Sequence, residues 1–159
     1  MTGNSLQEIE SFLYLETSYL DKPDLDKWVD LFTKDGKYWM PASQTQTDPL
    51  NHVSHIYDDR VMMEIRRRNF VHPRSASKSH LTRCSHIIGN IQISSGENTD
   101  EINVTSNMHV IVWYRDEQQI YAAKCEHILI PQDETFKIRH KRVELINPEA
   151  PQKSLVIYL

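Results

Sequence analysis

Two Cys-x-His pairs are the feature of this sequence that most invites a chemical interpretation. Cys84 with His86 forms the first pair, and Cys125 with His127 forms the second. Thiolate and imidazole groups are the ligands of zinc sites and of Rieske iron–sulfur clusters. A Rieske site, however, combines Cys-x-His with Cys-x-x-His in neighbouring loops, whereas both pairs here have one intervening residue and fall in expected strands. Free cysteine usually packs as a small apolar side chain, so we expect no metal site in this chain.

A second possible metal site has the composition of an iron site with two histidines and one carboxylate. Its members are His52, His55 and Asp58, spaced three residues apart. This spacing gathers the side chains only if the segment is helical. Because Pro49 favours a loop for the residues that follow it, we expect capping or ion pairing rather than iron binding.

Acid–base catalysis is the more serious enzymatic alternative. Asp21, Tyr38, Tyr57, His86 and His109 are residue types that a dehydratase or isomerase uses to move protons in a pocket. Histidine suits this role because its unperturbed pKa lies near neutrality. The chain has 8 histidines and 7 tyrosines, so some of them must lie near any cavity. Independent catalysis therefore stays the alternative to a supporting role.

Composition limits the remaining classes. The 159 residues suit one domain spanning 1–159, with 25% charged and 39% hydrophobic residues as in ordinary folded proteins. No P-loop, dinucleotide-binding glycine motif, nucleophile elbow or His-Glu-x-x-His motif occurs, and only 4 glycines are present. The start of the chain is polar, and no apolar run is long enough to span a bilayer. Two cysteines suit a reducing compartment, so we expect a cytoplasmic protein without a membrane partner.

A basic island interrupts a chain whose formal net charge is -4. Residues 60–83 hold seven basic side chains against the single acid Glu64, whereas the flanking regions are acidic. Phe70 is the only aromatic residue there, which argues against a nucleic-acid partner that stacks bases. Arginine pairs with carboxylates through two parallel hydrogen bonds. The candidates for ion pairs that brace the fold or a subunit interface are Arg60, Arg66, Arg68 and Arg83.

Helices are expected in the first half of the chain. Ser5 followed by Glu8 is a capping box, and apolar residues then recur at helical spacing through Leu20. Asp24 is a good N-cap for a second helix over residues 24–33. Asp58 or Asp59 can begin a third helix that runs to about Arg68. Its buried stripe is predicted to consist of Val61, Met62 and Ile65.

Strands dominate the second half. Asp35-Gly36 predicts a turn into a short strand over 37–41, and longer alternating runs cover 87–93, 102–114, 118–130 and 135–146. The ending, Ser154 to Leu159, is predicted to be a last strand or a docked tail. Helices followed by long strands favour an α+β fold, with helices against one face of a strongly curved antiparallel sheet. The odd-numbered face of 103–113 then either lines a pocket or meets solvent or a partner.

A collinear set of segments covers nearly the whole chain. These are Phe12-Leu13, Leu20-Asp21, Trp28 to Phe32, Asp35 to Pro41, Ser54 to Arg60, Thr82 to Ile91, Lys141 to Asn147 and Val156 to Leu159. Together they resemble the small subunits of aromatic-ring-hydroxylating dioxygenases. The family's Ser-Arg-Thr-Arg-His block has Ser85 at its second arginine here, so that arginine's contact is not carried over. The chain is also short for the family, which leaves the subfamily open.

The resemblance implies a cone-shaped roll of the nuclear transport factor 2-like kind. It also implies a hexamer of three large (alpha) and three small (beta) subunits. In this family the large subunit holds the Rieske 2Fe-2S cluster and the mononuclear iron, and electrons arrive from NADH through a reductase. Both atoms of O2 are added to an aromatic ring to give a cis-dihydrodiol. The small subunit, which this chain resembles, holds no cofactor and mainly supports the assembly, so we expect the isolated chain to form a trimer.

Overall fold

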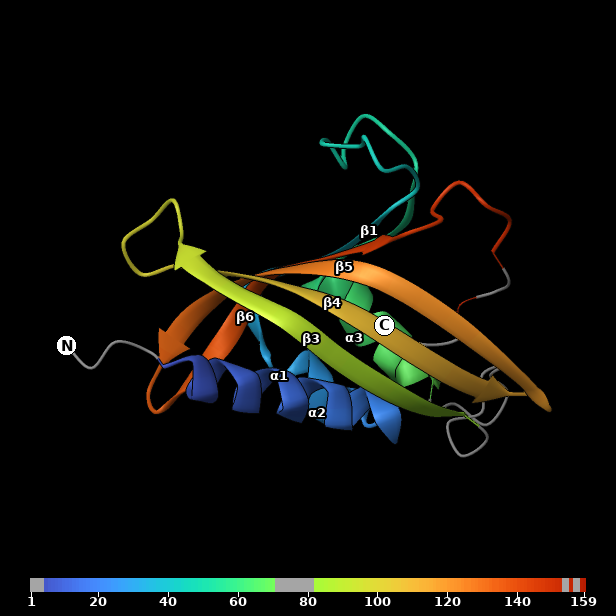
Figure 1. The fold of residues 1–159 in the computed structure, drawn as a ribbon, viewed down its shortest axis with the longest axis horizontal. Coiled ribbons are helices and arrows are strands. Elements are labelled where there is room, and N and C mark those ends of the chain that lie inside the picture. The colour runs from blue at the N-terminus through green and yellow to red at the C-terminus, as the bar shows by residue number, and fades with distance from the viewer. Residues whose placement is uncertain (1–4, 71–81, 153–154, 156–157) are drawn as a thin grey trace.

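The computed structural model describes residues 5–70, 82–152, 155 and 158–159. Within these ranges three helices pack against one strongly curved sheet, as Figure 1 shows. The helices are α1 (Leu6–Asp21), α2 (Leu25–Val29) and α3 (Arg60–Phe70). The strands are β1 (Phe32–Pro41), β2 (Ser54–Asp59), β3 (Arg83–Ser95), β4 (Ile102–Tyr114), β5 (Glu117–Gln132) and β6 (Thr135–Leu145).

The first two helices begin where the capping residues predict. Ser5 Oγ accepts a hydrogen bond from the Glu8 amide, and Glu8 Oε2 accepts one from the Ser5 amide, which completes the capping box. Asp24 Oδ1 likewise accepts from the Lys27 amide at the start of α2. The second helix is shorter than predicted, because Phe32 already pairs with Ile138 as the first residue of β1.

The sheet has the order β2-β1-β6-β5-β4-β3 and confirms the predicted α+β class. Neighbouring strands are antiparallel except β1 and β6, which are parallel. In the chain, β2, α3 and three further strands lie between these two strands. Asp35 and Gly36 lie inside β1, so this strand begins earlier than the predicted range 37–41. The chain still bends sharply at these residues, because a Cβ on Gly36 would lie 2.9 Å from the Phe32 Cβ and from the Thr33 carbonyl oxygen, and the register against β6 shifts between Phe32 and Lys37.

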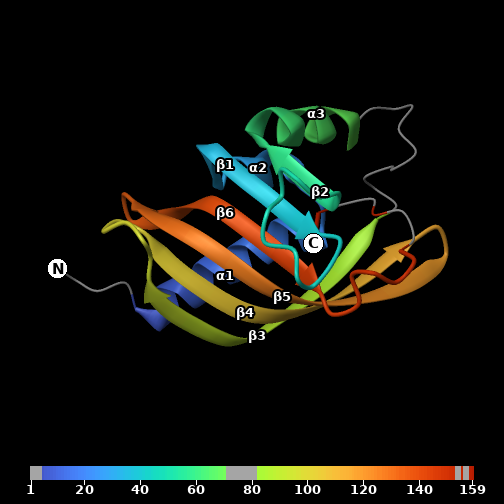
Figure 2. The same cartoon turned by 90° about the horizontal axis from the view of Figure 1, so that it is seen from above.

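The two faces of β4 differ completely in environment. Even-numbered residues such as Val104, Val110 and Val112 are buried against the helices, whereas His109 and Trp113 are exposed. The odd-numbered face is the outer surface of the sheet, and Thr105 and Asn107 line an open cavity of about 320 Å³ there with residues of β3 and β5. Figure 2 shows β3–β6 from this side, with α1 behind them. The alternative that this face meets solvent or a partner fits the structure.

The third helix has its predicted start but not its predicted orientation. Asp59 Oδ1 accepts from the Met62 amide, and the helix runs to Phe70. Met63 and Phe70 are its buried residues, whereas the predicted buried stripe of Val61, Met62 and Ile65 is exposed. Arginine contacts described below fix the helix in this orientation.

The end of the chain is a docked tail where it is described. Tyr158 and Leu159 are buried in the core, and the Tyr158 ring stacks on Trp28 with centroids 4.4 Å apart. Leu159 exchanges backbone hydrogen bonds of 3.2 Å with the Tyr38 hydroxyl. Among the described residues, no helix is both long and apolar enough to cross a bilayer.

Candidate functional site

A charged cluster lies inside the cone, between α1 and the sheet. Glu16 is fully buried and accepts hydrogen bonds from Lys141 Nζ at 2.5 Å and from His127 Nε2 at 2.9 Å. The indole nitrogen of Trp28 donates a third, at 3.3 Å. Three donors from α2, β5 and β6 thus converge on one carboxylate of α1, which ties the helical layer to the sheet.

Local geometry explains why a lysine points into this core. In β6 the extra residue Arg139 forms a bulge against β5, since Ile138 pairs with Leu129 and His140 with Ile128. The bulge changes which residues face inward, so Lys141 takes the inner position that strict alternation from Ile138 assigns to His140. Glu16 lies on the same face of α1 as Leu13 and Leu20, which places its carboxylate opposite Lys141.

Electrostatics keep Glu16 ionised despite its burial. Burial alone raises the pKa of this carboxyl, but the charge of Lys141 and the hydrogen bonds from His127 and Lys141 outweigh it and hold the pKa well below its ordinary value. The charges of the cluster are therefore paired within the protein. Its contacts stabilise the packing of α1 and α2 against β5 and β6.

A second polar pair joins α1 to β3. Asp21 Oδ1 accepts from the His86 amide at 3.0 Å and from His86 Nδ1 at 2.5 Å. The His86 side chain is fully buried, and its Nε2 has no hydrogen-bond partner among the described residues. Burial lowers the pKa of His86 although Asp21 opposes the shift, so the imidazole is neutral with Nε2 as a potential proton acceptor.

The five residues of the acid–base alternative are only partly brought together. Asp21 and His86 are in contact, and Tyr38 lies in the same interior but holds the chain end through its hydroxyl. Tyr57 is half-buried in β2 opposite Trp39. His109 lies on the outer face of the sheet, away from the others.

The four candidate arginines lie in different settings. Arg60 donates to the carbonyl oxygens of Val29 at 2.9 Å and Phe32 at 2.7 Å, which anchors α3 to α2 and β1. Arg66 pairs with buried Asp58, which also accepts from the Tyr158 hydroxyl at 2.5 Å.

The other two arginines contact backbone oxygens. Arg68 donates to the Glu64 carbonyl at 3.4 Å, and Arg83 donates to the Thr82 carbonyl at 2.8 Å.

The residues of the two Cys-x-His pairs face the interior and are engaged within the fold. The imidazoles are hydrogen-bonded to Asp21 and Glu16. Burial raises the pKa of both thiols to about 12, whereas a metal ligand is a thiolate. Within the described ranges, no group of three or more His, Cys, Asp or Glu side chains is placed to hold a metal ion.

The candidate iron triad is not assembled either. His55 lies in strand β2 and contacts the Pro148 carbonyl, while Asp58 is engaged with Arg66 and Tyr158.

The outer face of the sheet carries an uncovered apolar surface. Cross-strand pairing aligns Ile111 with Ile120, and the Ile146 amide bonds to Ala122, which pairs with His109 opposite Ile87. We call the following set the outer apolar face: Ile87, Ile111, Trp113, Ile120 and Ile146, which are 38–71% exposed. Monomeric proteins rarely expose a contiguous apolar patch of this kind, so the surface is suited to contact with another protein.

Comparison with known proteins identifies the family. The model of the ring hydroxylating beta subunit family matches residues 15–151 of the chain. The chain belongs to this family. It is 29% identical over 148 residues to the benzoate 1,2-dioxygenase subunit beta of Acinetobacter baylyi, covering 90% of this chain and 87% of that protein. It is 33% identical over 138 residues to the biphenyl 2,3-dioxygenase subunit beta of Rhodococcus jostii, covering 79% and 72% of the two chains.

A solved structure of a family member has the same fold. The benzoate 1,2-dioxygenase beta subunit of Burkholderia mallei superposes with a TM-score of 0.77 at 28% identity, covering 96% of this chain and 97% of that one. The predicted family and the nuclear transport factor 2-like architecture are therefore confirmed. As a beta subunit of this family, the chain is a component of a dioxygenase that also has a large subunit.

Glu16, Lys141 and Tyr158 are the interior residues that sequence reasoning missed. A carboxylate at position 16, between the buried positions Leu13 and Leu20, was one available signal. Lys141 gave a mixed signal, because alternation from Val143 and Leu145 places it inside whereas alternation from Phe136 and Ile138 places it outside.

Proposed function

We propose that this chain is the non-catalytic small subunit of an aromatic-ring dioxygenase. In the proposed assembly, three small subunits support three large subunits, each with a Rieske 2Fe-2S cluster and a mononuclear iron. The complex adds both atoms of O2 to an aromatic ring to give a cis-dihydrodiol, with electrons supplied by NADH through a reductase. Family membership supports the large-subunit partner.

Donor chemistry supports assigning both iron centres to the large subunit. The two thiols of this chain are held protonated by burial, and the two partner imidazoles already bond to carboxylates. Cys84 and Cys125 are free thiols, which suits the cytoplasm as the proposed location. Elemental analysis of the purified chain alone is expected to find no stoichiometric iron or zinc. One equivalent of either metal, lost on Cys84→Ser or Cys125→Ser, overturns the cofactor-free assignment.

The outer apolar face is the observation that carries the proposal of a supporting subunit. A side chain such as Ile120, 71% exposed on a regular strand, contributes little to the fold of the single chain. Burying it against a neighbour removes apolar surface from water, at about 25 cal/mol per Å². We infer that this face is covered in the hexamer.

Co-expression with a large subunit of a dioxygenase of this family tests the assembly. Wild-type chain is expected to co-purify in a complex whose mass, from light scattering, corresponds to three copies of each subunit. Ile120→Asp should abolish this complex while the free chain keeps its melting temperature. Leu50→Asp is the matched control, because Leu50 is 78% exposed but lies outside the outer apolar face. Equal assembly of both variants contradicts the role of this face.

A second candidate function, proton transfer by a dehydratase or isomerase, is favoured by one observation. The Asp21–His86 contact resembles an acid–base pair, and His86 Nε2 has no hydrogen-bond partner in the part of the chain that the structure describes. The test is dehydration of a β-hydroxy ketone by the isolated chain, followed through the absorbance of the conjugated product. We expect no turnover. Turnover that is lost in both His86→Asn and Asp21→Asn would replace the supporting role by catalysis.

A further inference from the structure

The third helix presents an apolar strip to solvent. Val61, Met62 and Ile65, here called the α3 strip, are 66%, 39% and 37% exposed. Positions 61, 65 and 68 follow one another along the same side of a helix, so the strip leads directly to Arg68. The surface thus combines exposed apolar side chains with a guanidinium at one end.

Three arginines prevent the helix from turning this strip inward. Arg60 is held by two backbone carbonyls, Arg66 by Asp58, and Arg67 by Asp26 at 2.5 Å and Glu64 at 2.7 Å. Arg68 differs from them. It contacts only a backbone carbonyl and has no carboxylate partner among the residues that the structure describes. The α3 strip is therefore held outward next to a cation that has no carboxylate partner within residues 5–70 and 82–152.

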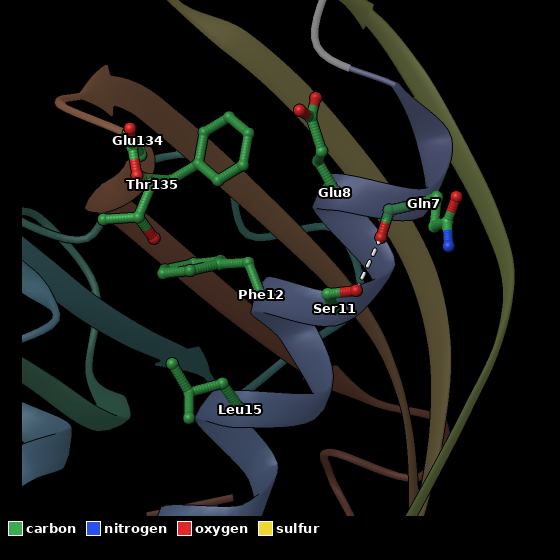
Figure 3. Close-up of a pocket in the computed structure, with 8 residues that line it drawn as sticks. Gln7, Glu8, Ser11, Phe12, Leu15, Glu134 and Thr135 are labelled. Carbon is green, nitrogen blue, oxygen red and sulfur yellow. Dashed lines mark hydrogen bonds between the residues drawn. The ribbon is translucent and has the colours of Figure 1, made fainter.

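A groove of complementary character lies between the start of α1 and the β5–β6 turn, as Figure 3 shows. Its volume is about 370 Å³, and its apolar lining consists of Phe12, Leu15 and Phe136. Glu8 and Glu134 stand at its rim, with Gln7, Ser11 and Thr135.

One of the two rim acids is free to pair. Glu8 Oε2 already accepts from the Ser5 amide, whereas Glu134 is exposed and has no ion-pair partner within the described residues. We call this site the acidic groove.

We propose that the α3 strip of one copy docks into the acidic groove of a second copy, with Arg68 paired to Glu134. Both halves of the contact are present on this chain, and each supplies the charge that the other lacks. Desolvated arginine–carboxylate pairs next to apolar anchors are typical of the central part of protein interfaces. Charge complementarity between the two surfaces thus identifies another copy of this chain as the occupant.

The geometry of the contact predicts its symmetry. Figure 2 shows α3 beside β1 and β2, whereas the groove is lined by the first turns of α1 and the β5–β6 turn, on a different side of the molecule. A contact between two different surfaces is head-to-tail, and such contacts form closed rings when the rotation between copies closes. The inference rests on the proposed trimer of small subunits and names the contact that would close it.

A charge swap tests the contact in the isolated chain. Arg68→Glu and Glu134→Arg should each raise the dissociation constant of self-association about tenfold. The double variant Arg68→Glu/Glu134→Arg should restore it. Lys34→Glu is the control, because Lys34 is exposed and lines neither surface. Analytical ultracentrifugation measures association, and circular dichroism confirms that each variant is folded.

Replacing an apolar residue of the α3 strip by a charged one supplies a second measurement. Ile65→Asp should weaken self-association by about 30-fold, whereas Leu50→Asp should not. Three outcomes overturn the inference: a wild-type chain that is monomeric at micromolar concentration, single variants that associate like wild type, or a double variant that is not rescued.

Loss of large-subunit binding alone, with self-association intact, also overturns it and assigns the α3 strip to that partner. Failure of the wild-type chain to bind the large subunit counts instead against the proposed function.

Discussion

The interior of the cone and its outer surfaces reverse the usual distribution of side chains. Inside, Glu16, His127 and Lys141 are polar groups removed from water that pair with one another through the Glu16 carboxylate. Outside, Ile87 and Ile120 are large apolar side chains left in water. The buried polar cluster stabilises the fold of the single chain, whereas the exposed apolar side chains are suited to contacts with other subunits.

Burying the charged cluster of Glu16, His127 and Lys141 has a large desolvation cost. The cluster is therefore stable only when these side chains are closely paired. Desolvating a carboxylate and an ammonium costs several kcal/mol each, and only close pairing with further hydrogen bonds offsets this cost. The cluster joins α1 with β5 and β6, elements that are far apart in sequence. A shift of the helix by one turn would strand Lys141, so we infer that the cluster fixes the position of α1 on the sheet.

The largest predicted effect comes from breaking this interior cluster. Glu16→Ala leaves Lys141 as an uncompensated buried charge, so it should lower the free energy of unfolding by about 3–5 kcal/mol. Urea denaturation at neutral pH measures the loss. Lys27→Ala is the control, since it removes an exposed pair with Asp24 that is worth about 0–1 kcal/mol.

A double variant sharpens the cause of that loss. Glu16→Leu/Lys141→Met removes both charges and should recover most of the stability, because no buried ion is left without a partner. If Glu16→Ala costs no more than the Lys27 control, the cluster is not a significant constraint on the fold.

Much of the fold could be predicted from local sequence signals, and the predictions that failed did so for physical reasons. The capping box at Ser5 and the alternation along β4 are short-range patterns, and both gave the correct elements. The apolar residues of α3 were assigned to the core because apolar residues usually are buried. Arg60 and Arg66 reversed that orientation through contacts with Val29 and Asp58, which no local pattern contains.

The candidate site was predictable only in part for the same reason. Asp21 and His86 were both named from residue type, but their contact depends on how α1 lies across β3. Lys141 could not be assigned by alternation alone, because counting from Ile138 and counting from Val143 give opposite faces, and the bulge at Arg139 that decides between them depends on pairing with β5. Sequence periodicity indicates faces reliably only where the strand is regular.

An intermediate effect is predicted for the pH dependence of stability. Burial lowers the pKa of His86 in the folded chain below its ordinary value of 6.5, so the unfolded chain binds a proton more readily. The contribution of neutral His86 is fully present above pH 6.5 and is lost as pH falls from there toward the folded pKa. Replacing His86 by Asn should flatten this part of the stability profile.

An exposed histidine provides the comparison for this profile. His109 lies on the outer face, so His109→Asn should leave the slope below pH 6.5 unchanged. Urea denaturation at a series of pH values from 7.5 to 5.5 measures both variants, over a window of about one unit on either side of the ordinary pKa. Equal slopes for wild type and His86→Asn would mean that His86 titrates normally.

The smallest effect on stability is predicted for the outer surface, and Trp113 is the residue that reveals it. The chain has three tryptophans, of which Trp28 and Trp39 are 0% and 5% exposed whereas Trp113 is 45% exposed. Trp113→Phe should therefore change the free energy of unfolding by no more than about 0.5 kcal/mol. It should also remove most of the fluorescence that acrylamide quenches in the free chain.

Binding of the large subunit and formation of the hexamer should protect Trp113 from acrylamide in the wild-type protein, because the outer apolar face is then covered. Quenching that is unchanged in the assembled complex would show that this face stays in water. The outer apolar face would then not be a subunit interface, whereas the role of the buried cluster in the fold would be unaffected.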